Sequence, residues 1–114
     1  MLANVCAALA PRLPEPWWEL TSTTPNEIDV RDACARELQL EIAPEHVIAR
    51  RAVRVVAKCR ACDEVLVELD GGEFALVHLT WRGSEEPSPW PTVQEIGPES
   101  VVYAAATVHE CVFG

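Results

Sequence analysis

The chain has 114 residues, a length typical of one domain, and we predict a single domain over 1–114 with residues 1–20 as a candidate peripheral arm. Hydrophobic residues make up 49% of the sequence, with only 9 Pro and 5 Gly, which indicates a folded chain rather than a disordered one. The formal net charge of -9 disfavours binding to nucleic acid or to anionic membranes. The same charge suits a basic protein partner, or serves solubility alone.

The first ten residues carry apolar side chains at helical spacing, at Leu2, Val5, Cys6 and Leu9. This pattern predicts a short amphipathic helix. The segment is much shorter than the roughly 20 residues that cross a bilayer, so we do not predict a membrane span. The five cysteines are an odd number without the density of a secreted disulfide scaffold. We therefore expect reduced thiols and a cytoplasmic location.

Two adjacent tryptophans, Trp17 and Trp18, follow a proline-rich link. Neighbouring side chains point to different faces in regular structure, so either one packs on the core and the other is left for a surface role, or both cover the core edge. A helix is predicted from Glu27 to about Leu40, with Asn26 or Asp29 as its cap. We expect His46, in the charged connector that follows, to be solvated.

Valine-rich residues 52–58 predict a strand, and 64–70 with 73–81 predict a hairpin around Asp70-Gly71-Gly72. Both faces of the second hairpin strand carry apolar residues, which is typical of a central strand covered on two sides. The prolines of 82–91 predict a loop, and apolar spacing over 99–112 favours a helix, although a strand also fits. The predicted fold class is α+β: an antiparallel three- to four-stranded sheet, a meander, with one or two packed helices.

The string Phe-Ala-Leu-Val-His-Leu-Thr-Trp over 74–81, followed by Pro-Trp-Pro at 89–91, resembles a family of small uncharacterised bacterial proteins. The likeness extends to Asp63-Glu64-Val65-Leu66 and to Asp70-Gly71, and it covers about residues 45 to 91. That family has no established activity. The resemblance implies a bacterial origin and a cytoplasmic location, and no chemistry.

Cys59-Arg60-Ala61-Cys62 has the spacing of a zinc knuckle or of a redox pair, and His109 and Cys111 can complete four ligands. Thiolates and imidazoles are the ligands that zinc prefers. His109 and Cys111, however, are separated by only one residue, whereas structural zinc sites usually have two well-formed half-sites. We therefore predict no metal ligands and no cofactor, and keep a metal-binding or thiol-redox protein using Cys59 and Cys62 as the alternative.

His78 is the candidate general base, because several carboxylates lie near it in the sequence. No nucleophile with an orienting partner can be picked out, so a histidine bonded to a backbone carbonyl is the favoured interpretation. The sequence also contains no phosphate-binding glycine-rich loop, no His-Glu-x-x-His and no nucleophile elbow. We predict that the protein is not an enzyme and has no catalytic residues.

The candidate partner-binding residues are Trp81, Glu85, Glu86 and Trp90. Tryptophan is enriched in interface hot spots, and an acidic rim around two of them suits a basic partner. The predicted function is therefore protein–protein binding, with an immunity or inhibitor protein as its sharpest form. A purely structural role for these tryptophans and a homodimer formed through the sheet are the other interpretations.

Overall fold

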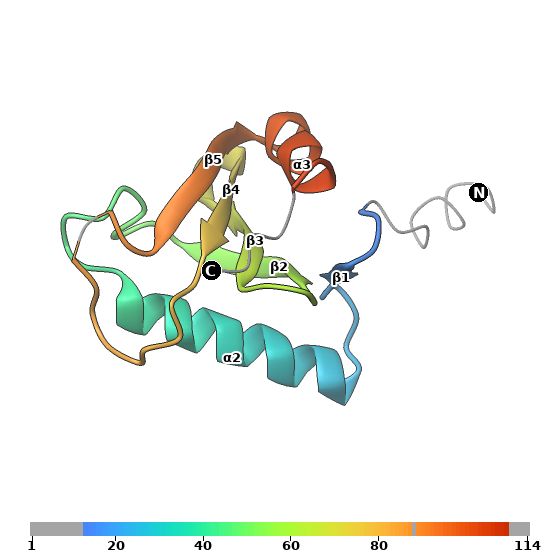
Figure 1. Ribbon diagram of the computed structural model, residues 1–114, viewed down its shortest axis with the longest axis horizontal. Helices are drawn as coiled ribbons and strands as arrows, with labels where there is room; N and C mark the ends of the chain where they lie inside the picture. Colours follow the sequence, from blue (N-terminus) through green and yellow to red (C-terminus); the bar gives the residue numbers. More distant parts are fainter. Residues whose placement is uncertain (1–12, 88, 110–114) are drawn as a thin grey trace.

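The computed structural model describes residues 13–87 and 89–109, which form a five-stranded antiparallel sheet with a helix on each side (Figure 1). The predicted helix around Leu2–Leu9 lies outside the described residues, as does Cys111. The elements in chain order are β1 (Trp17–Glu19), α2 (Pro25–Glu41), β2 (Val53–Cys59), β3 (Glu64–Leu69), η1 (Asp70–Gly72), β4 (Glu73–His78), β5 (Thr92–Pro98) and α3 (Glu99–Thr107).

The strands pair in the order β1-β2-β3-β4-β5, which confirms the α+β class and the meander. The predicted three to four strands become five because β1 and β5 join the two edges. Three residues in β1 are too few to show a period, and β5 ends on Gly97 and Pro98, which usually indicate a loop. Its alternation is also broken by a register shift opposite Leu76 and Val77.

The hairpin around residues 70–72 forms as predicted, although β4 ends at His78 rather than at 81. Gly71 and Gly72 have φ of 76° and 80°, in the left-handed region where a side chain is strained. Val65 pairs with Val77 and Glu64 with His78. The last of these pairs places two titratable side chains on one face of the sheet.

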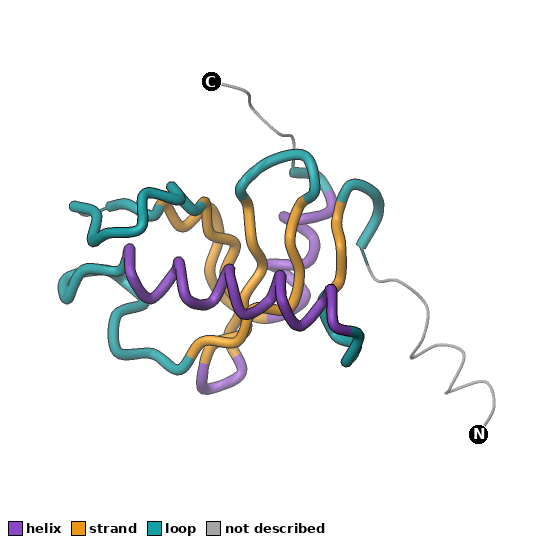
Figure 2. Tube along the Cα trace, turned by 90° about the horizontal axis from the view of Figure 1, so that it is seen from below, coloured by secondary structure: helices purple, strands orange, loops and turns teal. Residues whose placement is uncertain are grey.

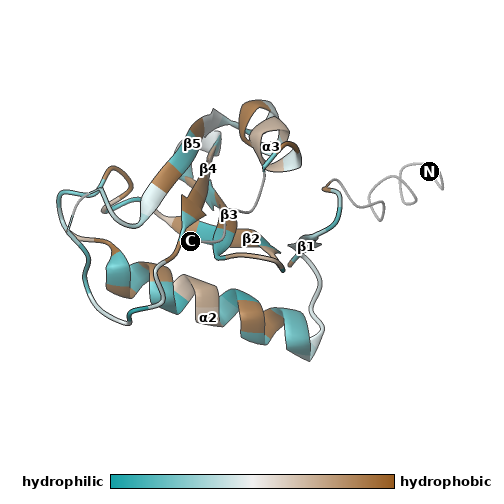
Figure 3. Cartoon of the chain, viewed as in Figure 1, coloured by the Kyte–Doolittle hydropathy of each residue, from teal (hydrophilic) through white to brown (hydrophobic). Residues whose placement is uncertain are grey.

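The sheet is covered on both faces, as the pattern of β4 predicts. On one face α2 packs Cys34 and Leu38 against Val65, Val67 and Val77, and Figure 2 shows this helix crossing the strands. On the other face α3 contributes Val102 and Ala106 to a second cluster with Leu66, Phe74 and Leu76. Figure 3 shows α3 as mostly hydrophobic and α2 as mixed, in agreement with one exposed face on the longer helix. Each fully buried Leu or Val contributes about 1.5–3 kcal/mol relative to exposure.

The long helix begins earlier than predicted. Its N-cap is Thr24, not Asn26 or Asp29, and Pro25 occupies the first turn, where its missing N–H costs nothing. Glu27 accepts the Ser22 N–H at 3.0 Å, and this bond lowers the Glu27 pKa. The helix therefore starts on a short polar turn and runs to Glu41.

Both tryptophans contribute to the core, on different faces of the sheet, because Trp17 belongs to the cluster with α3 and Trp18 packs against the cluster with α2. Trp17 is buried and its indole Nε1 donates to the Ala106 carbonyl at 2.9 Å, which fastens β1 to α3. Trp18 is half-buried, and the Arg60 guanidinium lies 4.6 Å from the centre of its ring. The segment after Pro98 is a helix through Thr107, so the strand alternative does not apply there.

Candidate metal centre and adjoining pocket

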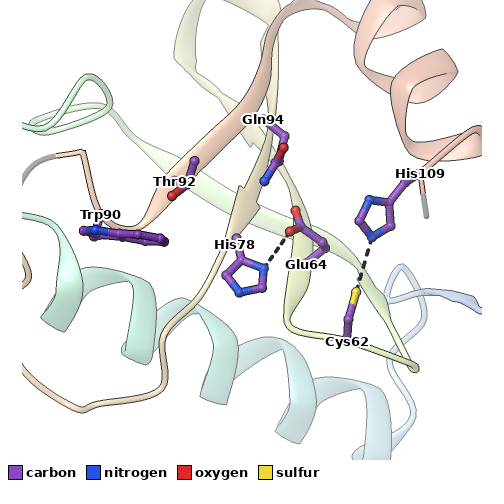
Figure 4. Close-up of a pocket in the computed structure, with 7 residues that line it drawn as sticks. All are labelled: Cys62, Glu64, His78, Trp90, Thr92, Gln94 and His109. Carbon is purple, nitrogen blue, oxygen red and sulfur yellow. Dashed lines mark hydrogen bonds and ion pairs between the residues drawn. The ribbon is translucent and has the colours of Figure 1, made fainter. Parts of the chain in front are cut away.

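Three potential metal ligands converge from different parts of the chain. Cys59 is the last residue of β2, Cys62 lies in the bend before β3, and His109 follows α3. One ligand atom from each lies within 4.8 Å of the other two. The Cys62 Sγ to His109 Nε2 distance is 3.3 Å (Figure 4).

Backbone contacts fix the bend that carries the two cysteines. The Lys58 ammonium donates to the carbonyls of Cys59 and Cys62, at 2.9 Å each, and so closes the bend on itself. The Arg60 N–H donates to the Pro16 carbonyl at 2.9 Å, which ties the bend to the segment before β1. The cysteines are therefore held by bonds independent of their own sulfur atoms.

His109 is placed by the end of α3. Its backbone N–H donates to the Ala106 carbonyl at 3.2 Å, and its ring lies 5.9 Å from that of Trp17. Because Trp17 also bonds Ala106, the same contacts that dock α3 on the sheet orient the imidazole. A shift of α3 along the sheet would move His109 away from the cysteines.

One of the ligand-atom separations, Cys62 Sγ to His109 Nε2, fits a tetrahedral metal ion, and all three separations lie within 4.8 Å. Zinc binds thiolate at about 2.3 Å and imidazole at about 2.0–2.1 Å, which places such ligand atoms roughly 3.5 Å apart. The Cys62–His109 separation of 3.3 Å is close to this value. Two thiolates with one imidazole also match the preference of zinc for sulfur and nitrogen.

The metal-ligand cluster opens onto a pocket of about 350 Å³. Cys62 and His109 line one side of it, and Trp90 lines another. Glu64 and His78 lie between these sides in Figure 4. Thr92 and Gln94 of β5 complete the lining.

Glu64 and His78 form a hydrogen-bonded pair within this pocket. The Glu64 side chain is 3% exposed. Its Oε1 accepts a hydrogen bond from His78 Nδ1–H, with 2.7 Å between the oxygen and the nitrogen. The expected bond from His78 to a backbone carbonyl is therefore wrong, because the antiparallel register sets this carboxylate directly opposite. Among the described residues, nothing donates to the buried second oxygen, Glu64 Oε2.

The predicted partner-binding residues lie on one loop after β4, in different environments. Trp81 and Trp90 are 40% and 45% exposed, and Glu85 is exposed. Glu86 is buried instead, and its Oε2 accepts a hydrogen bond from the Thr80 hydroxyl at 2.7 Å. Its carboxylate therefore stabilises the loop rather than forming part of an exposed acidic rim. Trp90 also lines a neighbouring pocket of about 310 Å³ with Thr80, Arg82, Glu86 and Pro87.

Carboxylates at the end of α2 hold the start of this loop. Glu41 is fully buried and accepts the Thr80 and Trp81 N–H groups, each at 2.9 Å. Glu37 accepts the Gly83 N–H at 2.8 Å. Burial, followed by a hydrogen bond with Glu37, raises the pKa of Glu41. Trp81 has a φ of 59°, a strained conformation that these bonds maintain.

His46 holds the other end of the loop. It is 6% exposed, which shows that the expectation of a solvated histidine is wrong. Its Nδ1 accepts the Ile48 N–H at 3.2 Å, so the proton is on Nε2, which donates to the Pro91 carbonyl at 2.6 Å. The charged residues around His46 in the sequence suggested an exposed position. Its partner, the Pro91 carbonyl, is 45 residues away, so no local sequence pattern indicates the bond.

Comparison of the chain with models of protein families, with curated proteins and with solved structures found no match. The resemblance of the 74–91 string to a bacterial family therefore stays a prediction. Within residues 13–87 and 89–109, neither helix has the length and apolar character needed to cross a membrane. The function has to be argued from the site itself.

Proposed function

We propose that this chain is a small zinc-binding protein of the cytoplasm, with Cys59, Cys62 and His109 as metal ligands. The observation that carries the proposal is the convergence of three soft ligand atoms within 4.8 Å, from two segments separated by 47 residues in the chain. A thiolate-rich site needs reduced cysteines, which agrees with a cytoplasmic location. Bound zinc would link the β2–β3 bend to the segment after α3.

The coordination number decides between two kinds of zinc site. Cys111, outside the described residues, is two positions beyond His109 and is the candidate fourth ligand. Four protein ligands make a closed structural site, whereas three leave a position for water or a ligand. Since Cys62 and His109 also line the pocket, an open position would face it.

The test is the metal content of protein purified without chelator. We expect about one zinc per chain, with affinity reduced at least about tenfold in Cys59→Ser, Cys62→Ser and His109→Ala. Cys34→Ala is the matched control, because this buried thiol lies in the α2 face of the core and burial raises its pKa. Removal of zinc should also lower the melting temperature, since a ligand of the native state stabilises it.

Two results would contradict zinc binding. One is a metal-free protein that does not take up added zinc. The other is a Cys59–Cys62 disulfide that forms and breaks reversibly without metal, which would favour the thiol-redox alternative. Cys111→Ser then separates the closed site from the open one, because only the closed site should lose affinity.

A second proposed function is protein binding through the loop after β4, in the manner of an immunity or inhibitor protein. It is favoured by two half-exposed tryptophans, Trp81 and Trp90, on a loop whose ends are fixed by Glu41 and His46. A rigid aromatic anchor loses little entropy on binding, and the net charge of -9 suits a basic partner.

This second function is tested by co-purification of a basic protein and by affinity measurement with the purified pair. Trp90→Ala should weaken the complex by at least about 2 kcal/mol, as expected for a hot spot. Val47→Ala is the control, because Val47 is 63% exposed and belongs to a different connector. Equal binding by both variants would contradict this surface. A concentration-dependent mass without any partner would instead favour a homodimer.

A further inference from the structure

We infer that the 350 Å³ pocket beside the cysteines binds a positively charged N–H group, with the guanidinium of arginine as its best ligand. The inference goes beyond zinc binding. It rests on the buried carboxylate of Glu64, the exposed indole of Trp90 and the charge of the pocket lining. Neither Glu64 nor Trp90 is a ligand in the proposed zinc site.

The bonding of the Glu64 carboxylate is incomplete. A carboxylate has two oxygens, and buried ones normally all accept hydrogen bonds. His78 satisfies Oε1, whereas Oε2 is buried with no donor among the described residues, although Glu64 is only 2% exposed. A ligand that donates N–H to Oε2 would complete the set, and a cationic donor makes the stronger bond.

The charge of the pocket also favours a cation. Among the described residues, its lining has a carboxylate, Glu64, and neither lysine nor arginine. A cation that enters the pocket therefore meets no competing lysine or arginine among the described residues, and the pair of Glu64 Oε1 with His78 can stay in place. The overall charge of -9 adds attraction at long range.

The indole of Trp90 also lines the pocket, and Trp90 as a whole is 45% exposed. A guanidinium is planar and weakly hydrated, so it stacks on an aromatic face while its edge donates to a carboxylate. Figure 4 shows the Gln94 side chain directed toward Glu64. Its amide oxygen and the Thr92 hydroxyl are further acceptors in the same lining.

β5 is shaped to expose this lining. Leu76 pairs with Glu95 and Val77 with Val93, so Gln94 is the extra residue of a bulge. Bulges redirect a side chain relative to the regular alternation of a strand. Here the bulge places Gln94 in the lining of the pocket and leaves it without a paired residue on β4.

The experiment is a calorimetric titration of the intact protein with three capped amino acids. N-acetyl-arginine amide should bind saturably, N-acetyl-lysine amide more weakly, and the uncharged isostere N-acetyl-citrulline amide at least about tenfold more weakly than arginine. Glu64→Gln should reduce arginine affinity at least about tenfold. Trp90→Ala should reduce it severalfold, while Trp81→Ala, outside the pocket, should not.

Free L-arginine distinguishes the source of the ligand. Tighter binding of the free amino acid than of the capped form indicates a small molecule, whereas equal binding indicates a side chain of a protein partner. Both outcomes support a cation site. Absence of saturable binding at millimolar concentration, equal binding of citrulline, or unchanged affinity in Glu64→Gln would each overturn it. If Glu64→Gln does not fold, unchanged affinity in Trp90→Ala overturns the inference instead.

The two proposed sites fail separately. Cys59 does not line the pocket, so Cys59→Ser should lose zinc and keep arginine binding. Glu64→Gln should lose arginine binding and keep zinc. Loss of both ligands in Cys59→Ser would show that the pocket exists only when metal is bound, and that the two sites are not independent.

Discussion

Glu41 at the end of α2 and Glu64 at the start of β3 are both almost completely buried, at 0% and 2% exposure, and are bonded differently. Both oxygens of Glu41 accept backbone N–H groups, from Thr80 and Trp81. Glu64 has a donor for one oxygen only, among the described residues. Since a buried polar group costs free energy unless it is bonded, the first carboxylate serves the fold and the second is available to a ligand.

The same contrast applies to two histidines, His46 at the end of the loop and His78 in the pocket. His46 bonds through both ring nitrogens and is buried, so it holds the end of the loop at Pro91. The His78 side chain is 35% exposed and lines the pocket beside Glu64. A region with complete bonding around the loop thus adjoins one with incomplete bonding, and substitutions in the first should cost more unfolding free energy than substitutions in the second.

The largest effect is expected from Glu41→Ala. It leaves two N–H groups without their acceptors and removes support from the strained Trp81 backbone. We expect a loss of about 3 kcal/mol of unfolding free energy, measured by urea denaturation. Glu45→Ala, at an exposed position, should change it by less than about 0.5 kcal/mol. Similar values for both variants would show that Glu41 does not hold the loop.

A smaller loss is expected from His46→Phe, which keeps an aromatic side chain and removes both hydrogen bonds. The Pro91 carbonyl and the Ile48 N–H would lose their partner, at a cost of about 2 kcal/mol. The unfolding free energy tests this, with His78→Phe as the comparison. His78→Phe should cost less, because its side chain reaches solvent. The reverse order would contradict the division into a framework and a pocket.

The sequence predicted the parts of the fold that local patterns determine. The hairpin follows from valine alternation and Asp70-Gly71-Gly72, and α2 and α3 from apolar spacing. The edge strands were missed because β1 is very short and the bulge at Gln94 removes the period of β5. These two strands are therefore recognised from their pairing with β2 and β4, which the sequence pattern does not show.

The candidate site was predicted in part. The residues Cys59, Cys62 and His109 were considered together, but the one-residue gap before Cys111 argued against zinc. Sequence spacing does not show that Trp17 and Ala106 dock α3 beside the bend. Likewise, only the register of β3 and β4 reveals that Glu64 is the partner of His78. The first of these features depends on contacts between distant segments, and the second on the register within the hairpin.

A smaller, pH-dependent effect sharpens the role of Glu41. Its pKa is raised in the native state, from 4.5, by burial and by the bond with Glu37. Above pH 4.5 the native state therefore binds more proton than the unfolded state, so this contribution is greatest at low pH and is lost as pH rises through the native pKa. The stability of the wild type relative to Glu41→Gln should increase as pH is lowered from about 7 to about 5.

This difference is measured by urea denaturation of both proteins at each pH. Asp70, with its pKa lowered by Arg51, and Glu27, with its pKa lowered by Ser22, contribute opposite slopes, but they are present in both proteins and cancel. A stability difference that stays constant with pH, or decreases toward low pH, would contradict the raised pKa of Glu41.

The smallest effect, and one of opposite sign, is expected from Glu64→Met. Methionine has a similar length, removes the unbonded Oε2, and leaves His78 able to bond water at its exposed side. Replacing a buried polar atom that has no partner should keep or raise the unfolding free energy, by up to about 1 kcal/mol. A loss of more than about 2 kcal/mol would mean that Glu64 supports the fold as Glu41 does. A stable Glu64→Met protein that no longer binds arginine would instead show a residue kept for its ligand at the expense of stability.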